Sequence, residues 1–295
     1  MSGALEARVA ATLDAPVVPE VRAIAEELGR ESGARAVLFY GSNLRTASLD
    51  GVLDFYVLTP GPQVEKIWPR VSYREWTRDG ATLRAKIATM ALETFARAAG
   101  GASRDTTIWA RFVQPSALAW AADETAKSEV ARAVASAACT AARLAAALGP
   151  KEGMAEDYWR ALFRATYRAE FRVEKPGREN DILSVNAGHF GGLLPLAWEA
   201  DGIAFERDGE RLAPKLGDTA RAATLHWWAA RTRLGKPLNL LRLVKASTTF
   251  EGAARYAAWK VERHTGVPVE LTPWREKHPV LAAPGVLWRV WRARR

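Results

Sequence analysis

Residues 34–59, ARAVLFYGSNLRTASLDGVLDFYVLT, decide the fold of the first part of the chain. Two apolar runs of strand length, residues 36–40 and 52–58, flank a loop that opens with Gly41-Ser42 and is rich in turn-forming residues. A glycine and a serine just after a strand let the backbone approach a ligand closely, and their amides and hydroxyl can donate to phosphate oxygens. The stretch therefore predicts two paired strands with a phosphate-binding loop between them.

A carboxylate interrupts the second apolar run. Asp54 lies between Leu53 and Phe55, and burying it is costly unless a cation or a hydrogen-bond donor meets it. We favour a Mg²⁺ ion as the partner of Asp54, because Mg²⁺ prefers hard oxygen ligands and would be bound to the same phosphates. Asp50 is a weaker candidate for a second ligand. The alternative is a β-hairpin with Asp50 in its turn and Asp54 paired with a buried Arg or Lys, since buried carboxylates are often structural.

Length and charge narrow the class of protein. The chain has 295 residues, of which 48% are hydrophobic and 25% charged, enough for two domains with real cores. An excess of 42 Lys and Arg over 33 Asp and Glu gives a net charge of +9, which favours anionic partners such as nucleotides, nucleic acid or an acidic membrane surface. Its one cysteine, Cys139, excludes an internal disulfide and a thiolate zinc cluster. Without a signal-peptide pattern or 18 consecutive apolar residues, we expect a cytoplasmic protein.

The periodicity along the chain predicts an α/β (α+β) fold, with a mixed sheet first and a mainly helical part after it. We expect helices within residues 1–32, split by Pro16 and Pro19. The further predicted elements are strands at residues 82–90 and 106–113, and helices at residues 91–99, 126–148, 158–172, 219–234 and 250–265. The predicted division is residues 1–120, 121–272 and 273–295. Lys86 lies within a predicted strand, either pointing at a triphosphate or solvated on an edge strand.

The first motif resembles the nucleotidyltransferase superfamily that includes DNA polymerase β. Two short motifs later in the chain make the resemblance more specific. Residues 155–190, AEDYWRALFRATYRAEFRVEKPGRENDILSVNAGHF, resemble a segment of the mitochondrial translocator assembly and maintenance proteins, which are CTP-dependent phosphatidate cytidylyltransferases. The residues that match the family's motifs are Tyr40, Gly41, Ser42, Leu53, Asp54, Phe55, Tyr167, Glu170, Phe171, Arg172, Asn186, His189, Phe190, Arg242, Lys245 and Ser247.

Two positions depart from the family pattern. Asn43 stands where the family has a glycine, which leaves a side chain beside the expected phosphate site. Ala169-Glu170 stands where the family has Gly-Asp, which keeps the charge on a longer arm. Both departures leave the implied reaction class intact.

The resemblance implies a Mg²⁺-dependent reaction in which CTP and phosphatidic acid give CDP-diacylglycerol and pyrophosphate. It implies triphosphate binding by Tyr40, Gly41 and Ser42. The other residues with an implied role are Asp54 and Asp50 for the metal, and Lys86, Arg172, Lys245 and Ser247 for phosphates. Glu170 and Arg172 have a structural alternative as an ion pair. His189 is interpreted as a core or helix-terminal histidine rather than a general base, because the attacking phosphate is already anionic.

The last residues, 284–295, read PGVLWRVWRARR. In a helix, aliphatic side chains share one face with Trp291, Trp288 lies at the border, and Arg289 and Arg292 lie away from that face. This arrangement is typical of a helix that lies on anionic lipid. The alternative is a terminal helix docked on the protein's own core. Because a two-tailed lipid acceptor must be reached at a membrane, we expect a peripheral protein on the inner face of the membrane.

Two other functions remain open at this point. One is a nucleotidyltransferase that acts on a soluble acceptor or on RNA, without any dependence on lipid. The other is a non-catalytic basic module that binds nucleic acid. Against the second, the sequence has no zinc-ligand spacing or recognisable nucleic-acid motif, and its aromatic residues lie mostly at core-like positions. Nucleic acid is therefore the less favoured partner.

Overall fold

The two apolar runs form paired strands in the computed structural model, which describes residues 3–293 except 66–68, 79, 170–177, 250–251 and 278. Strand β1 (Ala36–Tyr40) pairs antiparallel with β2 (Leu53–Thr59), and Tyr40 lies opposite Asp54. The loop between them begins with a short helix, α3 (Ser42–Thr46), where the sequence predicts only turns. The two predicted strands are thus confirmed, with a helical turn in the loop between them.

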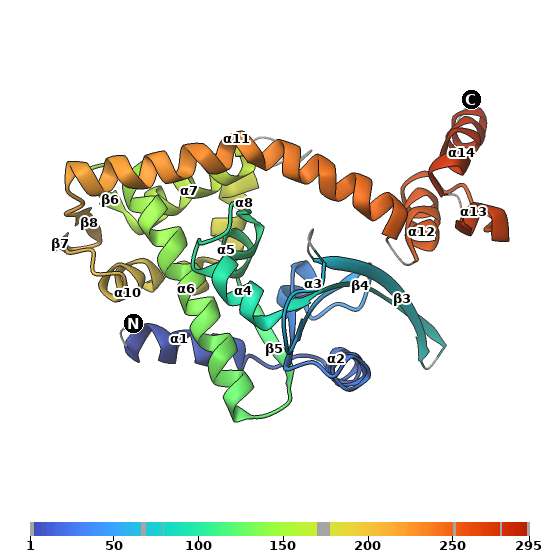
Figure 1. Ribbon diagram of the computed structural model, residues 1–295, viewed down its shortest axis with the longest axis horizontal. Coiled ribbons are helices and arrows are strands. Elements are labelled where there is room, and N and C mark those ends of the chain that lie inside the picture. Colours follow the sequence, from blue (N-terminus) through green and yellow to red (C-terminus); the bar gives the residue numbers. More distant parts are fainter. Residues whose placement is uncertain are drawn as a thin grey trace.

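Three more strands complete a mixed sheet (Figure 1). They are β3 (Arg70–Arg78), β4 (Ala81–Ala91) and β5 (Ser116–Ala121), and the order across the sheet is β3-β4-β2-β1-β5. Only β2 and β4 pair in parallel, and the other neighbours are antiparallel. The predicted mixed α/β class is confirmed. Since β4 lies between β2 and β3, the alternative that Lys86 is solvated on an edge strand is wrong.

One predicted strand is a helix. Residues 106–113 contain α5 (Thr107–Phe112), and the strand follows Pro115 as β5 instead of ending there. In α5 the side chains of Ile108, Trp109 and Phe112 are buried, a spacing that fits one face of a helix. Short apolar runs are compatible with either element, and length alone does not separate them.

The two faces of the sheet have different covers. Helix α2 (Pro19–Ser32) begins at a proline, ends at Gly33 with φ 58°, and packs on β1, β2 and β5. On the opposite face lie α4 (Leu92–Ala99), α5 and the central helix α6 (Glu124–Leu148). Helix α1 (Gly3–Leu13) packs mainly on α6.

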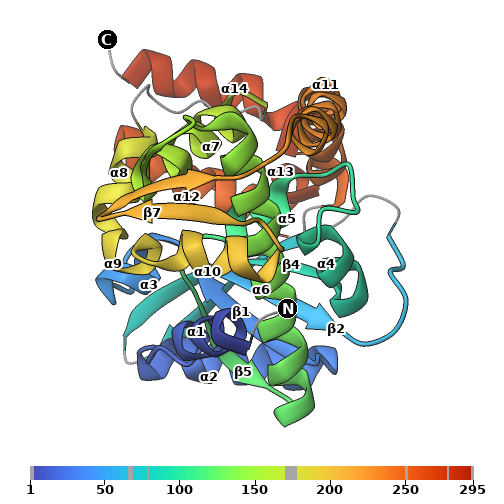
Figure 2. The same ribbon diagram turned by 90° about the vertical axis from the view of Figure 1, so that its left-hand side faces the viewer.

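The helical half is built around α6. Against α6 pack α7 (Ala155–Ala169), α10 (Leu193–Ala200) and the long α11 (Asp218–Thr249). The remaining small elements are α8 (Arg178–Val185), α9 (Ala187–Phe190), and a three-stranded sheet of β6 (Gly153–Met154), β8 (Arg211–Pro214) and β7 (Phe205–Asp208), visible in Figure 2. One buried cluster joins side chains of β1 and β2 with those of α6 and α7. The predicted boundary at residue 120 therefore crosses a shared core.

Helix α6 is also the one helix, within the described residues, that is long and apolar enough to cross a membrane, and it is mostly buried in this core. Its alanine-rich faces allow close packing on several neighbours, and Cys139 is among its buried side chains.

The C-terminal helices lie beside the β3 edge of the sheet (Figure 1). Helix α11 runs from α6 and α7 to β3, and α12 (Ala253–Thr265) then packs on β3. Helices α13 (Pro273–Lys277) and α14 (Pro279–Ala293) follow. Helix α14 starts five residues before the segment 284–295 and contains Pro284 within it.

Candidate active site

A row of polar side chains crosses one face of the sheet. Paired residues on neighbouring strands point to the same face, and the strand register places one residue of each strand in this row. From β5 to β3 they are Ser116, Tyr40, Asp54, Lys86 and Tyr73. Asp54 and Lys86, two of the predicted site residues, are therefore direct neighbours on adjacent strands in the middle of the sheet.

Gly41 brings the backbone against the Asp54 carboxylate. Its φ is 95°, and a β-carbon at this position would lie 3.2 Å from Oδ2 of Asp54. Any other residue would be strained there and would crowd the carboxylate. The backbone at Gly41 therefore lies close to the Asp54 side chain.

The side chain of Asn43 stabilises the loop between β1 and β2 by hydrogen bonds within that loop. Its buried side chain donates through Nδ2 to the carbonyl oxygens of Ser48 and Asp50, both at 2.8 Å. Ser42 Oγ lies 3.4 Å from Asn43 Oδ1. The expectation that Asn43 leaves a side chain beside the phosphate site is thus corrected, because the amide is bound inside its own loop.

A cavity of about 570 Å³ opens over this end of the row. Its walls come from the β1–α3 junction, β2, α5, α7 and α8, so it joins the two halves of the chain. The predicted site residues in the wall are Tyr40, Gly41, Ser42, Asp54, Tyr167 and Asn186. The wall residues that the sequence analysis missed include Arg45, Arg111, Gln114 and Asp181.

Asp54 lines this cavity, and burial and neighbouring charges have opposite effects on its pKa. Burial raises its pKa, and the nearby charges of Lys86 and Arg111 oppose that rise. Burial likewise lowers the pKa of Lys86, and Asp54 opposes that change. Within the described part of the chain, no hydrogen bond or ion pair reaches the Asp54 carboxylate. The cations that the hairpin alternative requires are therefore near Asp54 but do not pair with it.

Arg111 completes the cationic wall. Its guanidinium lies 4.9 Å from the centroid of the Tyr40 ring, and burial raises the pKa of Tyr40 to about 12. Because Ile108, Trp109 and Phe112 face the core, the helical turn leaves Arg111 on the cavity side. Because this segment was predicted to be a strand, the position of Arg111 at the cavity was not predicted. A helical interpretation of the same apolar spacing would have revealed it.

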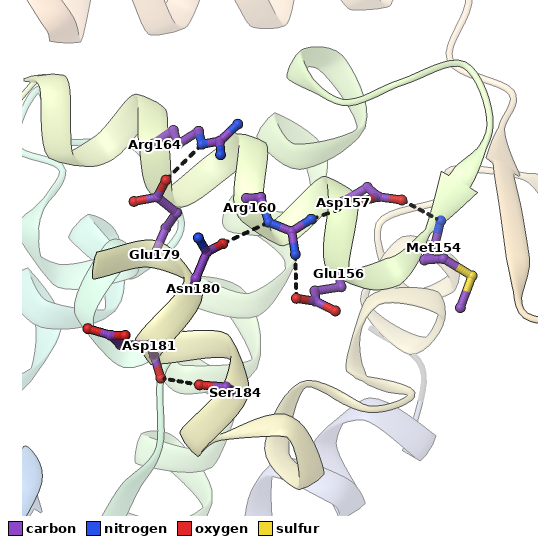
Figure 3. Close-up of polar contacts among 9 residues, drawn as sticks. All are labelled: Met154, Glu156, Asp157, Arg160, Arg164, Glu179, Asn180, Asp181 and Ser184. Carbon is purple, nitrogen blue, oxygen red and sulfur yellow. Dashed lines mark hydrogen bonds and ion pairs between the residues drawn. The ribbon is translucent and has the colours of Figure 1, made fainter. Parts of the chain in front are cut away.

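Polar contacts between α7 and α8 shape the far wall (Figure 3). Arg160 Nε donates to Asn180 Oδ1 at 3.0 Å, and Arg164 Nε donates to Glu179 Oε1 at 2.8 Å. These contacts hold α8 so that its later residues line the cavity. Asn186 follows, with its Nδ2 donating to the Ile182 carbonyl at 2.8 Å.

His189 has a structural contact. Its Nε2 donates to the Val113 carbonyl at 2.8 Å, and burial lowers the pKa of the imidazole. Arg8 donates to the backbone carbonyls of His189 and Gly191, at 3.0 and 2.5 Å. His189 is not in the wall of the Asp54 cavity. Its interpretation as a core histidine fits these contacts.

Other predicted residues lie apart from the cavity or outside the described residues. Asp50 is exposed and is not in the cavity wall. Glu170 and Arg172 lie outside the described residues, as do the side chains of Lys245 and Ser247 on α11.

The described residues contain no group of three or more His, Cys, Asp or Glu side chains that could hold a metal ion. At this cavity Mg²⁺ would be held by Asp54 together with phosphate oxygens of a substrate, an arrangement that Mg²⁺ commonly adopts. Comparison with protein-family models and with curated proteins finds no match to this chain.

Proposed function

We propose that this protein is a nucleotidyltransferase that moves the cytidylyl group of CTP to phosphatidic acid. The observation that carries the proposal is the convergence of separate motifs on one cavity. Gly41, Ser42 and Asp54 come from the first motif, and Tyr167 and Asn186 come from the motif of residues 155–190, yet all line the same cavity of about 570 Å³. Their meeting at one cavity supports a shared function.

The wall chemistry suits a triphosphate. Gly41 offers close backbone approach, Ser42 a hydroxyl, and Arg45 and Arg111 positive charge. Guanidinium groups make two-pronged contacts with phosphate oxygens. In the proposed reaction a phosphate oxygen of the acceptor attacks the α-phosphorus of CTP, the bond to the β-phosphate oxygen breaks, and pyrophosphate leaves with the electron pair. Positioning and positive charge supply most of the catalysis in such reactions.

Mg²⁺ fits this proposal as a shared ion. Asp54 would hold it together with phosphate oxygens of CTP, and the ion would neutralise charge on the transferring group. The residues of the chain would orient the triphosphate through Gly41 and Ser42. Lys86 lies next to Asp54 on the adjacent strand, and its positive charge favours the ionised form of the carboxylate.

A lipid acceptor is supported by the C-terminal helix. Trp288 and Trp291 of α14 are 56% and 51% exposed, and Arg289 and Arg292 are exposed between and beside them. The Arg292 guanidinium lies 5.4 Å from the Trp288 ring centroid. Exposed tryptophan beside arginine favours the boundary of an anionic bilayer. Removal of residues 284–295 should release the protein from anionic vesicles without unfolding it, and unchanged co-sedimentation would contradict this membrane contact.

The test is a product assay. Purified protein is incubated with CTP labelled in the base, Mg²⁺ and phosphatidic acid in mixed micelles, and the lipid phase is examined for cytidine. The wild type should give a labelled lipid, and Asp54→Asn should not. Asp208→Asn, the same chemical change on exposed β7, is the matched control and should keep full activity. Equal product from Asp54→Asn would contradict the site.

Further arms separate the alternative functions. Label in a water-soluble phosphomonoester or in RNA, with none in lipid, would assign a soluble acceptor or RNA. No turnover of CTP, combined with nucleic-acid binding that falls steeply with salt, would favour a non-catalytic basic module.

A further inference from the structure

The row across the sheet has a second end, which α12 covers. The rings of Tyr73 on β3 and Tyr256 on α12 have centroids 5.4 Å apart. At the first end, Arg111 of α5 lies over Tyr40. Asp54 and Lys86 occupy the middle of the row, between α5 on one side and α12 on the other.

Helix α12 carries two cations toward this middle. The Lys260 ammonium lies 5.7 Å from the centroid of the Tyr256 ring, and its charge helps to lower the pKa of Lys86. The Arg263 guanidinium lies 5.2 Å from the Trp259 ring centroid, and its Nη1 is 3.1 Å from where a β-carbon on Gly51 would lie. Arg263 thus contacts the loop that leads into β2.

These cations lack acidic partners. In the described part of the chain, no ion pair within 4.0 Å involves Lys86, Lys260 or Arg263, and the carboxylate beside Lys86 is Asp54. Lys260 lies close enough to Lys86 for their positive charges to repel each other, and an anionic ligand would remove that repulsion. The anion site predicted at Gly41 and Ser42 lies toward the other end of the row.

We propose that Lys86, Lys260 and Arg263 bind the phosphate group of the acceptor, on the opposite side of Asp54 from the nucleotide cavity. This inference rests on the proposed function. In-line transfer requires the attacking oxygen and the leaving pyrophosphate on opposite sides of the α-phosphorus. Arg45 and Arg111 then face the triphosphate, and the α12 cations face the attacking phosphate.

The attacking step balances without a base. An anionic oxygen of the acceptor phosphate forms the new bond to the α-phosphorus, the bond to the β-phosphate oxygen breaks, and pyrophosphate carries away the electron pair. The chain path also fits a lipid acceptor. Helix α12 continues into α13 and α14, which carry exposed Trp274, Trp288 and Trp291.

Binding of each substrate alone tests the assignment. Calorimetric titrations use a water-soluble, short-chain phosphatidic acid and, separately, Mg²⁺ with CTP, so that loss of charge does not act through a micelle surface. The double variant Lys260→Gln with Arg263→Gln should weaken phosphatidate binding by about tenfold or more, because charge-assisted hydrogen bonds are lost. Its affinity for CTP should be unchanged. Lys151→Gln with Lys215→Gln, which removes the same charge from exposed positions, should change neither affinity.

Arg111→Gln provides the opposite expectation. It should weaken CTP binding and leave phosphatidate binding intact. Loss of CTP affinity in the double variant, with normal phosphatidate affinity, would overturn the acceptor assignment while leaving the proposed function in place. Unchanged phosphatidate affinity in the double variant would overturn it as well. If the wild type binds phosphatidate through these residues but turns over no CTP, the acceptor-phosphate site stands and the proposed transferase function falls.

Discussion

The two faces of the central sheet are built by alternate residues of the same strands, and they serve different ends. On the α2 face, Phe39 and Phe55 have ring centroids 5.2 Å apart and are buried with Leu53. On the opposite face, Tyr40 and Asp54 occupy the adjoining positions and border a cavity. One face therefore supplies packing energy, and the other exposes unpaired charge that packing alone would not favour.

The difference between the two faces explains how a strand can contain a buried carboxylate. Leu53 and Phe55, the two neighbours of Asp54 on β2, are fully buried on the α2 face. Their burial offsets the cost of holding Asp54 near Lys86 without a direct ion pair. Substitutions on the two faces should consequently separate stability from activity.

The largest effect is expected for Asp54→Asn. The variant keeps the shape of the side chain but loses the charge that the proposed site needs. Turnover should fall by about a thousandfold, which corresponds to several kcal/mol of lost charge stabilisation. The midpoint of thermal unfolding should stay the same or rise, because a buried carboxylate without hydrogen bonds is removed. A large drop in that midpoint, together with lost activity, would assign Asp54 a structural role.

The neighbouring residue should behave in the opposite way. Phe55→Ala removes a fully buried ring from the α2 face and should lower the free energy of unfolding by about 3–5 kcal/mol. Urea denaturation measures this loss. Turnover per folded molecule, assayed at low temperature, should remain within about threefold of wild type. A specific loss of activity in the folded fraction would show that the two faces are not separable.

Gly41→Ala should affect both properties, at a smaller scale. The left-handed φ of 95° should cost about 1–3 kcal/mol of stability, and the added β-carbon would press on Asp54 Oδ2 and lower activity. Gly209→Ala is the matched control, since Gly209 also has positive φ but no atoms within 4 Å of its β-carbon position. It should lose stability alone. Equal activity in the two variants would remove Gly41 from the site.

The smallest expected effect is on the pH dependence of stability, and it comes from His189. Its folded-state pKa is lowered by burial, with the positive charge of Arg8 adding to that effect. The unfolded chain therefore binds more protons as the pH falls below about 6.5, and stability should fall with it. His189→Gln, which can still donate to Val113, should flatten this pH dependence of the urea midpoint. His226→Gln, on the exposed side of α11, should retain it.

Much of this face was predictable from local sequence. Asp54 interrupts an apolar run and Gly41-Ser42 follows a strand, so both features are visible within a few residues. Arg111 was missed because Ile108, Trp109 and Phe112 fit a strand as well as a helix over so short a segment. Strand β3 was missed because an edge strand, exposed along much of its length, carries little apolar alternation.

The α12 contribution could not be predicted from local patterns at all. Lys260 and Arg263 approach the row only because Tyr256 packs on Tyr73, a contact between residues far apart in the chain. Ordinary helical periodicity predicts that α12 exists, but not which strand it meets. The small sheet of β6, β7 and β8 was missed because its strands are only two to four residues long.

The position of the transferred phosphorus distinguishes cytidylyl transfer from transfer of a terminal phosphate. The wild type is incubated with Mg²⁺, phosphatidic acid and CTP carrying radioactive phosphorus at either the α or the γ position. We expect the α label to appear in the lipid product and the γ label to leave entirely as pyrophosphate, with both signals lost in Asp54→Asn. Label from the γ position in the lipid, or no transfer from either position, would contradict it.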